Sequence, residues 1–414
     1  MKKTLLLSVA ASAMLMAGGD IAPVVETEAA PAPAEFLIFN NIYAKGEIRP
    51  RYEFVDVADN AADDANAYTN RLTLGVGADF LQIDGLSVYL EGTNVMGSGD
   101  FFDTTNGYAG IYEKVVDPDQ SRVTQAYIDY KFSDTLIRTG RQGVNLDNQR
   151  FIGTVNWRQM PQTYDAAAII NNSIENLDLM AAYVWRVNTV KDFDFDTNSV
   201  LLHAAYHFMP ELTVTAYDYL IEDFADTYGI AATGNIGLDF GKLNYRLEYA
   251  HEADPTNGTG TADADYYNIQ AGLNMSGFLV GAQYEVLGAG NDGNGAFYTP
   301  LATLHAHNGW ADIFLGGTPI NGLVDLNGMI GYKADGFGVA KVIYHDFSSD
   351  KNSIDYGTEV DAVYKNKIPG VKGLSGLIKA AWYSTDADTP VGAGGWTHDT
   401  TKFWVMLDYK FSTK

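Results

Sequence analysis

Ten arginines give this sequence its most distinctive polar chemistry. All of them lie between Arg49 and Arg246, whereas the rest of the chain relies on lysine for positive charge. A guanidinium is a planar fork of donors that suits carboxylate, phosphate or sulfate. Within strand-like segments, several basic residues take the parity opposite to the apolar residues, and we expect them, together with Arg141, to share one polar face: Lys45, Arg49, Arg51, Arg71, Arg186 and Arg246. This spacing predicts a basic surface that attracts anions.

Pairing with nearby acids is the alternative role of these arginines. Glu47, Glu53 and Glu248 fall at the same parity, so each could neutralise an arginine and hold the polar face together. The two interpretations are compatible, because one set of residues can stiffen a wall and set its selectivity.

The histidines offer a second possible chemistry, and it is weaker. His203 and His207 are expected on one strand face, too far apart to share an ion, whereas His305 and His307 lie close to Asp312 and could bind a metal. No serine stands in a recognisable arrangement with histidine and aspartate or asparagine, as nucleophilic catalysis would require. We therefore predict no enzymatic activity, no metal site and no cofactor.

The charge balance limits the possible partners. The 414 residues include 52 acidic and 27 basic side chains, for a formal charge of −25, and no cysteine. A chain this acidic repels phosphates, so nucleic acid is not expected as a partner. The acidic connectors between strands are expected to be solvated surface charge beside lipopolysaccharide and membrane lipid, with calcium bridging as an alternative.

The N-terminus has the form of a secretory signal peptide. Lys2 and Lys3 precede an apolar stretch from Leu5 to Met16, and small residues follow. We predict a signal peptide over residues 1–17, with cleavage possible as late as residue 34, and an acidic leader rich in alanine and proline over residues 18–41. The remaining residues, 42–411, are predicted to form one domain.

That domain has alternating apolar and polar residues throughout, which is typical of strands. In Ile42–Val57, for example, Ile48, Tyr52 and Phe54 alternate with charged side chains. The connectors alternate as well, since short ones such as 133–134 and 276–277 are separated by long ones rich in Asp, Asn, Gly and Thr. Counting segments gives about 18 strands, and tight turns at one end with long loops at the other are the mark of an outer-membrane barrel. We predict an all-β, antiparallel up-and-down transmembrane β-barrel in the outer membrane of a Gram-negative bacterium.

Aromatic residues and the last segment agree with a barrel. Tyrosine and tryptophan recur near the ends of the strands, where interfacial girdles are expected: Tyr43, Tyr89, Tyr130, Tyr206, Tyr249, Tyr332, Tyr344, Tyr383 and Trp404. The final segment, which ends at Phe411 and three further residues, resembles the terminal strand that the barrel-assembly machinery recognises.

Two stretches resemble the alginate-export porin family. In the first, Ile137–Ile169, a strand end, a loop and the start of a returning strand follow in the family's order: Gly140, Arg141 and Gln142, then Asp147, Arg150, Trp157 and Arg158, then Asp165 and Ala166. The second, Thr299–Leu315, is similar to the family's histidine and tryptophan segment: His307, Gly309, Trp310, Ala311 and Asp312. The resemblance implies an eighteen-stranded monomeric channel, rather than a trimer, whose basic constriction passes an anionic uronate polymer.

Three functions are therefore considered. The first is a porin for passive diffusion of small hydrophilic solutes, preferentially anions or uronate-type saccharides. The second is a dedicated exporter of an alginate-like exopolysaccharide. The third is a structural or adhesive surface barrel, plugged by long loops such as Gly97–Gln120 and Gly288–Gly322.

Overall fold

The computed structural model describes residues 37–99, 101–104, 110–256, 263–291, 293–386 and 395–414. The chain divides into two units, Met1–Leu37 and Ile38–Lys414. The predicted signal peptide and most of the predicted leader lie outside the described residues. All strands of the described residues belong to the second unit, which is the subject below.

Eighteen strands and two short 3₁₀ helices make up this unit. The strands begin at Phe39 and end at Ser412, slightly beyond the predicted range of 42–411. Their bounds are β1 Phe39–Val57, β2 Ala65–Phe80, β3 Leu86–Ser98, β4 Gln120–Phe132, β5 Thr135–Gln142, β6 Thr163–Ile174, β7 Leu177–Asn188, β8 Asp194–Met209, β9 Leu212–Ile221, β10 Ala225–Leu238, β11 Gly241–Ala253, β12 Asp263–Met275, β13 Phe278–Leu287, β14 Leu323–Ala334, β15 Gly338–Ser348, β16 Asp355–Lys367, β17 Leu374–Ser384 and β18 Thr400–Ser412; the helices are η1 Leu304–Ala306 and η2 Gly395–Thr397. Among the described residues, no helix has the length and apolar character needed to cross a membrane.

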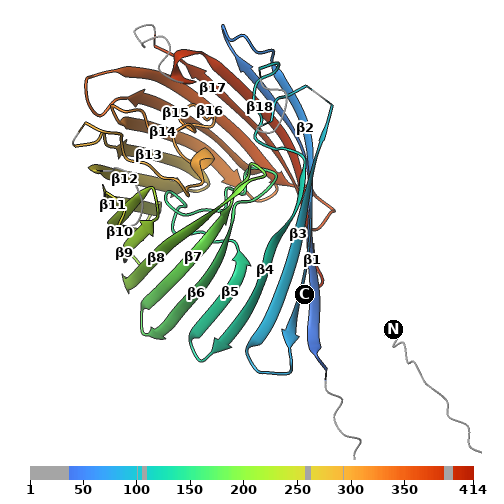
Figure 1. Ribbon diagram of the computed structural model, residues 1–414. Helices are drawn as coiled ribbons and strands as arrows, with labels where there is room; N and C mark the ends of the chain where they lie inside the picture. The colour runs from blue at the N-terminus through green and yellow to red at the C-terminus, as the bar shows by residue number, and fades with distance from the viewer. Residues whose placement is uncertain (1–36, 100, 105–109, 257–262, 292, 387–394) are drawn as a thin grey trace, which may run out of the picture. The chain divides into compact units, whose positions relative to one another are not determined.

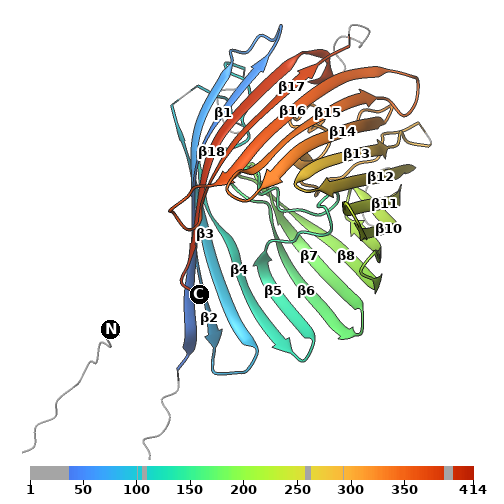
Figure 2. The same ribbon diagram turned by 180° about the vertical axis from the view of Figure 1, so that it is seen from behind.

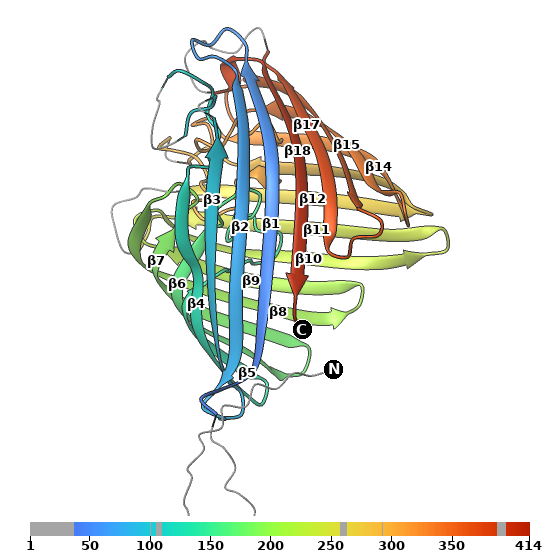
Figure 3. The ribbon, with the colours of Figure 1, turned by 90° about the vertical axis from the view of Figure 1, so that its right-hand side faces the viewer.

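The strands form one closed antiparallel sheet. Each strand pairs with its neighbours in sequence (Figures 1 and 2), and β18 pairs with β1 from Lys45 opposite Ser412 to Val57 opposite Thr400. Figure 3 shows β1, β2 and β18 side by side at this closure. Closure leaves no unpaired edge, which a sheet in lipid requires because lipid cannot hydrogen-bond to free backbone groups.

Alternate residues of each strand face outward and inward. On β2, Leu72, Leu74 and Val76 are 39%, 53% and 51% exposed, whereas Arg71 and Thr73 between them are about one-twentieth exposed. The period of two thus places aliphatic side chains on the lipid face and polar ones inside, as the sequence predicted.

The connections differ in length between the two ends of the barrel. Residues 133–134 and 276–277 form two-residue turns at one end, here called the turn end, whereas residues 99–119, 143–162 and 288–322 connect strands at the other, the loop end. In the turn between β12 and β13, Ser276 and Gly277 both have positive φ, 50° and 92°. This is the conformation that closes a two-residue hairpin without opposing the twist of its strands.

The aromatic prediction is correct for some residues and wrong for others. Five of the tyrosines lie on the outer face with exposures between 37% and 50%: Tyr130, Tyr206, Tyr249, Tyr332 and Tyr344. Tyr89, Tyr383 and Trp404 are instead buried on the inner face, at 6%, 2% and 0% exposure. Their strand parity points them inward. There Trp404 packs against Trp157 of the β5–β6 connection, Tyr383 donates to Trp396 O, and Tyr89 lies beside Tyr43 and Tyr127 of the wall.

Candidate functional site

Two long connections fold into the barrel and pack against each other. The first inner loop, residues 143–162, connects β5 to β6, and the second inner loop, residues 293–322, leads into β14. Backbone hydrogen bonds join them, from Gly153 N to Leu301 O at 2.9 Å and from Thr303 N to Gln149 O at 3.0 Å. Both loops can be followed within the ring of strands in Figure 1. The interior is therefore partly filled by two loops that behave as one packed body.

An aromatic cluster seals the two loops against the wall. Phe151 of the first inner loop lies 5.2 Å from Tyr217, 5.3 Å from Tyr266 and 6.0 Å from Phe297 between ring centroids. Tyr217 and Tyr266 come from β9 and β12, and Phe297 comes from the second inner loop. Burial of such large apolar surfaces stabilises the inward position of both loops.

The first inner loop is bound to the wall by three of the predicted basic residues. Arg49 Nη1 donates to Asn156 O at 2.8 Å, and Arg51 Nη1 donates to Trp157 O at 2.7 Å. Arg71 Nη1 donates to Asn156 Oδ1 at 2.7 Å. All three arginine side chains point inward, as predicted, and each residue is 5% exposed or less.

These arginines also have carboxylate partners. Arg49 pairs with Glu47 at 2.5 Å, and Arg51 pairs with Glu53 at 3.0 Å and with Asp117. Asp117 lies in the β3–β4 connection and is 1% exposed. The arginines on β1 therefore hold a loop and neighbouring acids, which favours the pairing role over a freely accessible basic surface.

Asp312 is the centre of a second charged group, which ties the second inner loop to the first and to the wall. Its carboxylate accepts from Arg158 Nη2 at 3.0 Å, from Lys402 Nζ at 3.2 Å and from His305 Nδ1 at 2.6 Å. Arg158 in turn pairs with Glu53 at 3.2 Å. One carboxylate therefore joins both inner loops to β1 and β18.

Burial sets the protonation states within this group. Burial lowers the pKa of His305 to about 3 despite the adjacent Asp312, so the imidazole is neutral at pH 7. For Asp312, burial alone would raise the pKa, but the hydrogen bond from His305 and the charges of Lys402 and Arg158 hold it well below its usual range. Neutral His305 can thus donate from Nδ1 to Asp312 while its Nε2 accepts from Lys379 Nζ at 2.6 Å.

Lys379 on β17 is surrounded by tryptophans. Its Nζ lies 3.7 Å from the ring centroid of Trp310 and 4.2 Å from that of Trp157. The Trp157 ring also stacks on His305 at 4.5 Å with an interplanar angle of 9°. Lys379 therefore contacts one tryptophan of each inner loop and links both to the wall.

The remaining motif residues of the first stretch lie at the two ends of the first inner loop. Gly140 has φ +121°, and Arg141 after it pairs with Asp165 through two contacts of 2.7 and 3.0 Å. Gln142 Nε2 donates to Ala166 O at 3.1 Å. These contacts fix the points where the first inner loop leaves β5 and rejoins β6.

A further group lies at the opposite wall. Arg150 Nε is 3.1 Å from Glu285, and its Nη2 donates to Asn308 Oδ1 at 2.9 Å. Burial lowers the pKa of His307 to about 4, with Arg150 adding to the effect, so this histidine is also neutral at pH 7. The motif residues at 150, 157, 158, 307, 310 and 312 therefore act in loop packing, and the described residues contain no group of three ligands that could hold a metal ion.

Two predicted basic residues lie apart from these groups. Arg186 is close to the loop end of β7 and pairs with Asp196 at 2.7 Å, with a side chain that is 39% exposed. Arg246 on β11 pairs with Glu248 at 2.7 Å. The predicted arginines are thus distributed over separate ion pairs and do not form one continuous surface.

The sequence reasoning did not identify several residues that complete the site. Lys379 and Lys402 are the inward members of alternating strands, so their parity was a usable signal. His305 stood out only as a possible metal ligand, whereas it links Asp312 to Lys379. His203, expected on one strand face with His207, contacts Asp147 of the first inner loop at 3.2 Å.

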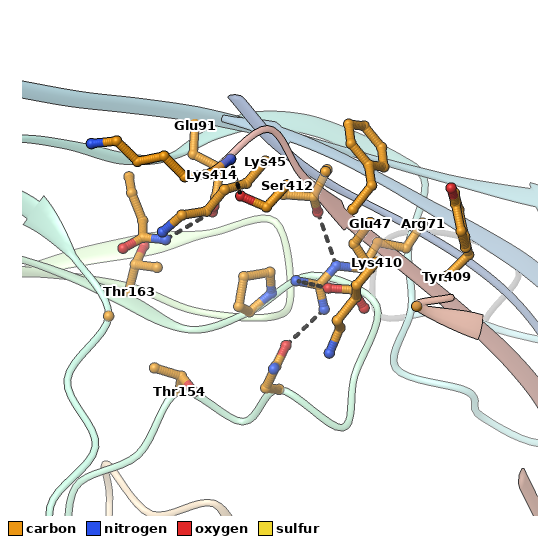
Figure 4. Close-up of a pocket in the computed structure, with 18 of the residues that line it drawn as sticks. Lys45, Glu47, Arg71, Glu91, Thr154, Thr163, Tyr409, Lys410, Ser412 and Lys414 are labelled. Atoms are coloured by element: carbon orange, nitrogen blue, oxygen red, sulfur yellow. Dashed lines mark hydrogen bonds and ion pairs between the residues drawn. The ribbon is translucent and has the colours of Figure 1, made fainter. Parts of the chain in front are cut away.

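A cavity of about 880 Å³ remains between the first inner loop, β1–β3 and the turn-end part of β18 (Figure 4). Glu47 and Glu91 are its acidic residues. Five basic residues border it: Lys45, Arg71, Lys372, Lys410 and Lys414. Three of the five, Lys372, Lys410 and Lys414, lie outside the predicted basic set.

Comparison with known proteins confirms the predicted family resemblance and fold. Residues 46–196 match the family model described as alginate export. Among solved structures, Pseudomonas aeruginosa OpdQ is 14% identical, with a TM-score of 0.70 over 91% of this chain and 100% of that chain. The structure of P. aeruginosa OpdK with vanillate is 13% identical, with a TM-score of 0.71 over 91% and 100%. Acinetobacter baumannii OccAB2 is 15% identical, with a TM-score of 0.71 over 91% and 99%.

No curated protein matches the sequence. The structural similarities show the fold, an 18-stranded outer-membrane porin barrel. Together with the apolar outer face and the match to the alginate-export family model, they support a location in the outer membrane of a Gram-negative bacterium.

Proposed function

We propose that the chain is a porin through which small hydrophilic solutes diffuse passively, with a preference for anions. The observation that carries this proposal is the excess of cations around the cavity of Figure 4, where five basic residues face two acidic ones. An ion responds mainly to charges within a Debye length, roughly 8–10 Å at ordinary ionic strength. The charge of the cavity wall should therefore outweigh the formal charge of −25 carried by the whole chain.

Lys45 is the best placed of these cations to act on a solute. Its Nζ lies 5.3 Å from the ring centroids of both Tyr43 and Tyr89. It has no carboxylate partner among the described residues, so its charge is not neutralised locally. Lys410 pairs with Asp408 at 3.2 Å, but its side chain is 55% exposed. Both lysines can therefore attract an anion that enters from the turn end.

Two comparisons support the anionic class. Vanillate, named with the OpdK structure, is a carboxylate, and alginate is a polymer of uronates. Uronate-type saccharides are accordingly the solutes that we propose to test first.

Reversal potentials across planar bilayers in a salt gradient test the proposal. We expect the wild-type channel to prefer chloride, and the double variant Lys45→Gln/Lys410→Gln to shift the reversal potential toward cations. Each lysine is also replaced singly, and Lys191→Gln is the matched control for these single variants, because it removes the same one positive charge in the β7–β8 connection, away from the cavity. A cation-selective wild-type channel, or equal shifts in the control and the double variant, would contradict the proposal.

A loop-plugged barrel is the second candidate, and the inward position of residues 293–322 favours it. Single-channel recording distinguishes the two: a porin conducts steadily, whereas a plugged barrel conducts only in rare events. The described residues contain no separate feature that favours a dedicated exporter.

A further inference from the structure

A second cavity, of about 360 Å³, lies between the second inner loop and strands β11–β15. Its wall differs in chemistry from the basic cavity, because neutral amides dominate it. Gln270, Gln283 and Asn327 stand directly opposite one another across β12, β13 and β14, and Asn244 on β11 borders the same space. Adjacent strands lie about 4.8 Å apart, so three amides form a short continuous row.

The amide row is available to a solute. The side chains of Asn244, Gln270 and Gln283 make no hydrogen bond to another described residue, and Asn327 Nδ2 has only a long contact of 3.3 Å to Asp325. Each amide group offers both donors and an acceptor. Water in the channel must satisfy them when no solute is present, and hydroxyl groups can replace that water.

Two glycines lie beside the row. Gly272 and Gly281 face each other across β12 and β13, and neither has a φ in the left-handed region. A Cβ on Gly272 would lie 2.8 Å from Asn244 Oδ1, and one on Gly281 would lie 3.2 Å from Met329 Cε. Because the backbone there suits any residue, what glycine provides is room for these two side chains to lie close to the wall, and Gly272 thereby keeps the Asn244 amide at the border of the cavity.

The second inner loop covers this hollow with an aromatic ring. Trp310 borders the cavity and is partly exposed. Its backbone N donates to Glu359 Oε1 at 2.5 Å, and its ring lies 3.7 Å from Lys379 Nζ, so its position is fixed before a solute arrives. A fixed indole offers a large apolar surface, to which the C–H face of a sugar ring is complementary.

Charge contributes little at this cavity. Asp325 pairs with His345 at 2.9 Å and accepts from Asn308 Nδ2 at 3.3 Å. Lys341 is the remaining charged residue at the border of the cavity. Recognition here must therefore depend mainly on hydrogen bonds and shape.

We propose that this cavity is a subsite for a polyhydroxylated, sugar-sized solute, whose hydroxyl groups bind the amide row while its ring faces Trp310. The volume falls within the range of small-molecule sites, about 300–1,000 Å³. The subsite does not require an anionic solute, and in this respect it goes beyond the proposed anion preference.

Blockade of the ionic current by glucose in planar bilayers tests the subsite. We expect glucose to reduce the current more strongly than a polyethylene glycol of the same size, which lacks hydroxyl groups along its length. In the variant Gln270→Met/Gln283→Met, which keeps side-chain length but removes hydrogen bonding, the half-blocking glucose concentration should rise on the order of tenfold. Gln125→Met, at the basic cavity, makes one substitution of the same kind elsewhere, which matches Gln270→Met and Gln283→Met tested singly, and should leave that concentration unaltered.

Two further variants separate shape from charge. Gly272→Ala should also weaken the glucose blockade, because its Cβ would displace the amide of Asn244, whereas Lys341→Met should not. Heat-modifiable migration on gels verifies that each variant is folded.

Equal blockade by glucose and polyethylene glycol in the wild type, or unchanged glucose blockade in the Gln270/Gln283 variant, would overturn the inference. Loss of the glucose blockade in Lys341→Met, with the blockade retained in the other variants, would also overturn the inference, since charge would then govern binding. Reversal potentials measured on the same channels assess the anion preference independently.

Discussion

At the scale of single residues, the arginines inside the barrel show how burial changes the role of a charged group. Arg51 is 1% exposed and lies between Glu53 and Asp117, both also 1% exposed. Removing one member of such a group leaves the others buried without a counter-charge. The roles of these arginines are therefore first structural and only then electrostatic toward a solute.

This reasoning predicts a large loss of stability in Arg51→Leu. We expect the variant to lose about 3–5 kcal/mol, the usual cost of breaking a buried ion pair. The measurement is the temperature at which the folded gel band converts to the unfolded one. Arg186→Leu is the control, because its ion pairs are exposed and should contribute little that can be measured. Equal effects of the two substitutions would show that the Arg51 group does not hold the loop.

His305 and His307 predict a dependence of stability on pH. Burial lowers their pKa values from 6.5 to about 3 and about 4. The unfolded chain therefore binds more protons than the folded chain between these values. The stability that the two neutral histidines contribute is fully present above pH 6.5 and falls as the pH decreases toward 4. We expect the unfolding temperature to decrease over this range, and less steeply in the His305→Asn/His307→Asn variant. Parallel profiles for wild type and variant would contradict the assignment.

At the scale of elements, one tight turn adds a further contact between the second inner loop and β16. Gly309 has φ +80°, and the backbone N–H groups of Trp310 and Ala311 after it donate to Glu359 Oε1 at 2.5 and 2.8 Å. A Cβ at Gly309 would lie 2.4 Å from the Glu359 carboxylate. Glycine is therefore required there both for its backbone angle and for the close approach of Glu359.

We predict that Gly309→Ala releases the second inner loop from the wall. Single-channel conductance should increase and become noisier, because the loop no longer holds one position. Gly293→Ala is a matched control, since Gly293 has φ +83° but no heavy atom within 4 Å of the added Cβ. The control carries only the backbone cost of about 1–2 kcal/mol, and its conductance should equal that of the wild type. An unchanged conductance in Gly309→Ala would show that this turn does not position the loop.

At the scale of the whole molecule, the asymmetry between turns and loops predicts the orientation in the membrane. Outer-membrane barrels place short turns in the periplasm and long loops outside. An epitope inserted at Asp63, in the β1–β2 connection, should be labelled on intact cells, whereas one at Asp134, in the two-residue turn after β4, should not. Labelling at Asp134 without breaking the cells would reverse the orientation.

Much of the fold follows from the sequence because a membrane barrel obeys a local rule. Each strand residue faces either lipid or the interior, so the period of two in segments such as Ile42–Val57 is sufficient to assign both faces. Turn lengths then gave the number of strands and the antiparallel order. The inward direction of Arg49, Arg51 and Arg71 follows from the same parity and is correct.

The partners of those side chains were decided only by the tertiary structure. Asp117 lies 66 residues from Arg51, and Asp312 lies 154 residues from Arg158, in connections whose sequences show no period that indicates an inward path. Which loops enter a barrel depends on the space that closure of the sheet leaves inside, and on aromatic and ionic contacts available only after closure.

The two cavities were also decided only by the tertiary structure. Lys45 and Lys410 border the same cavity because β18 pairs with β1, and Gln270 lies opposite Gln283 because of the register between β12 and β13. Local alternation therefore determined the wall of this protein, and long-range packing determined its interior.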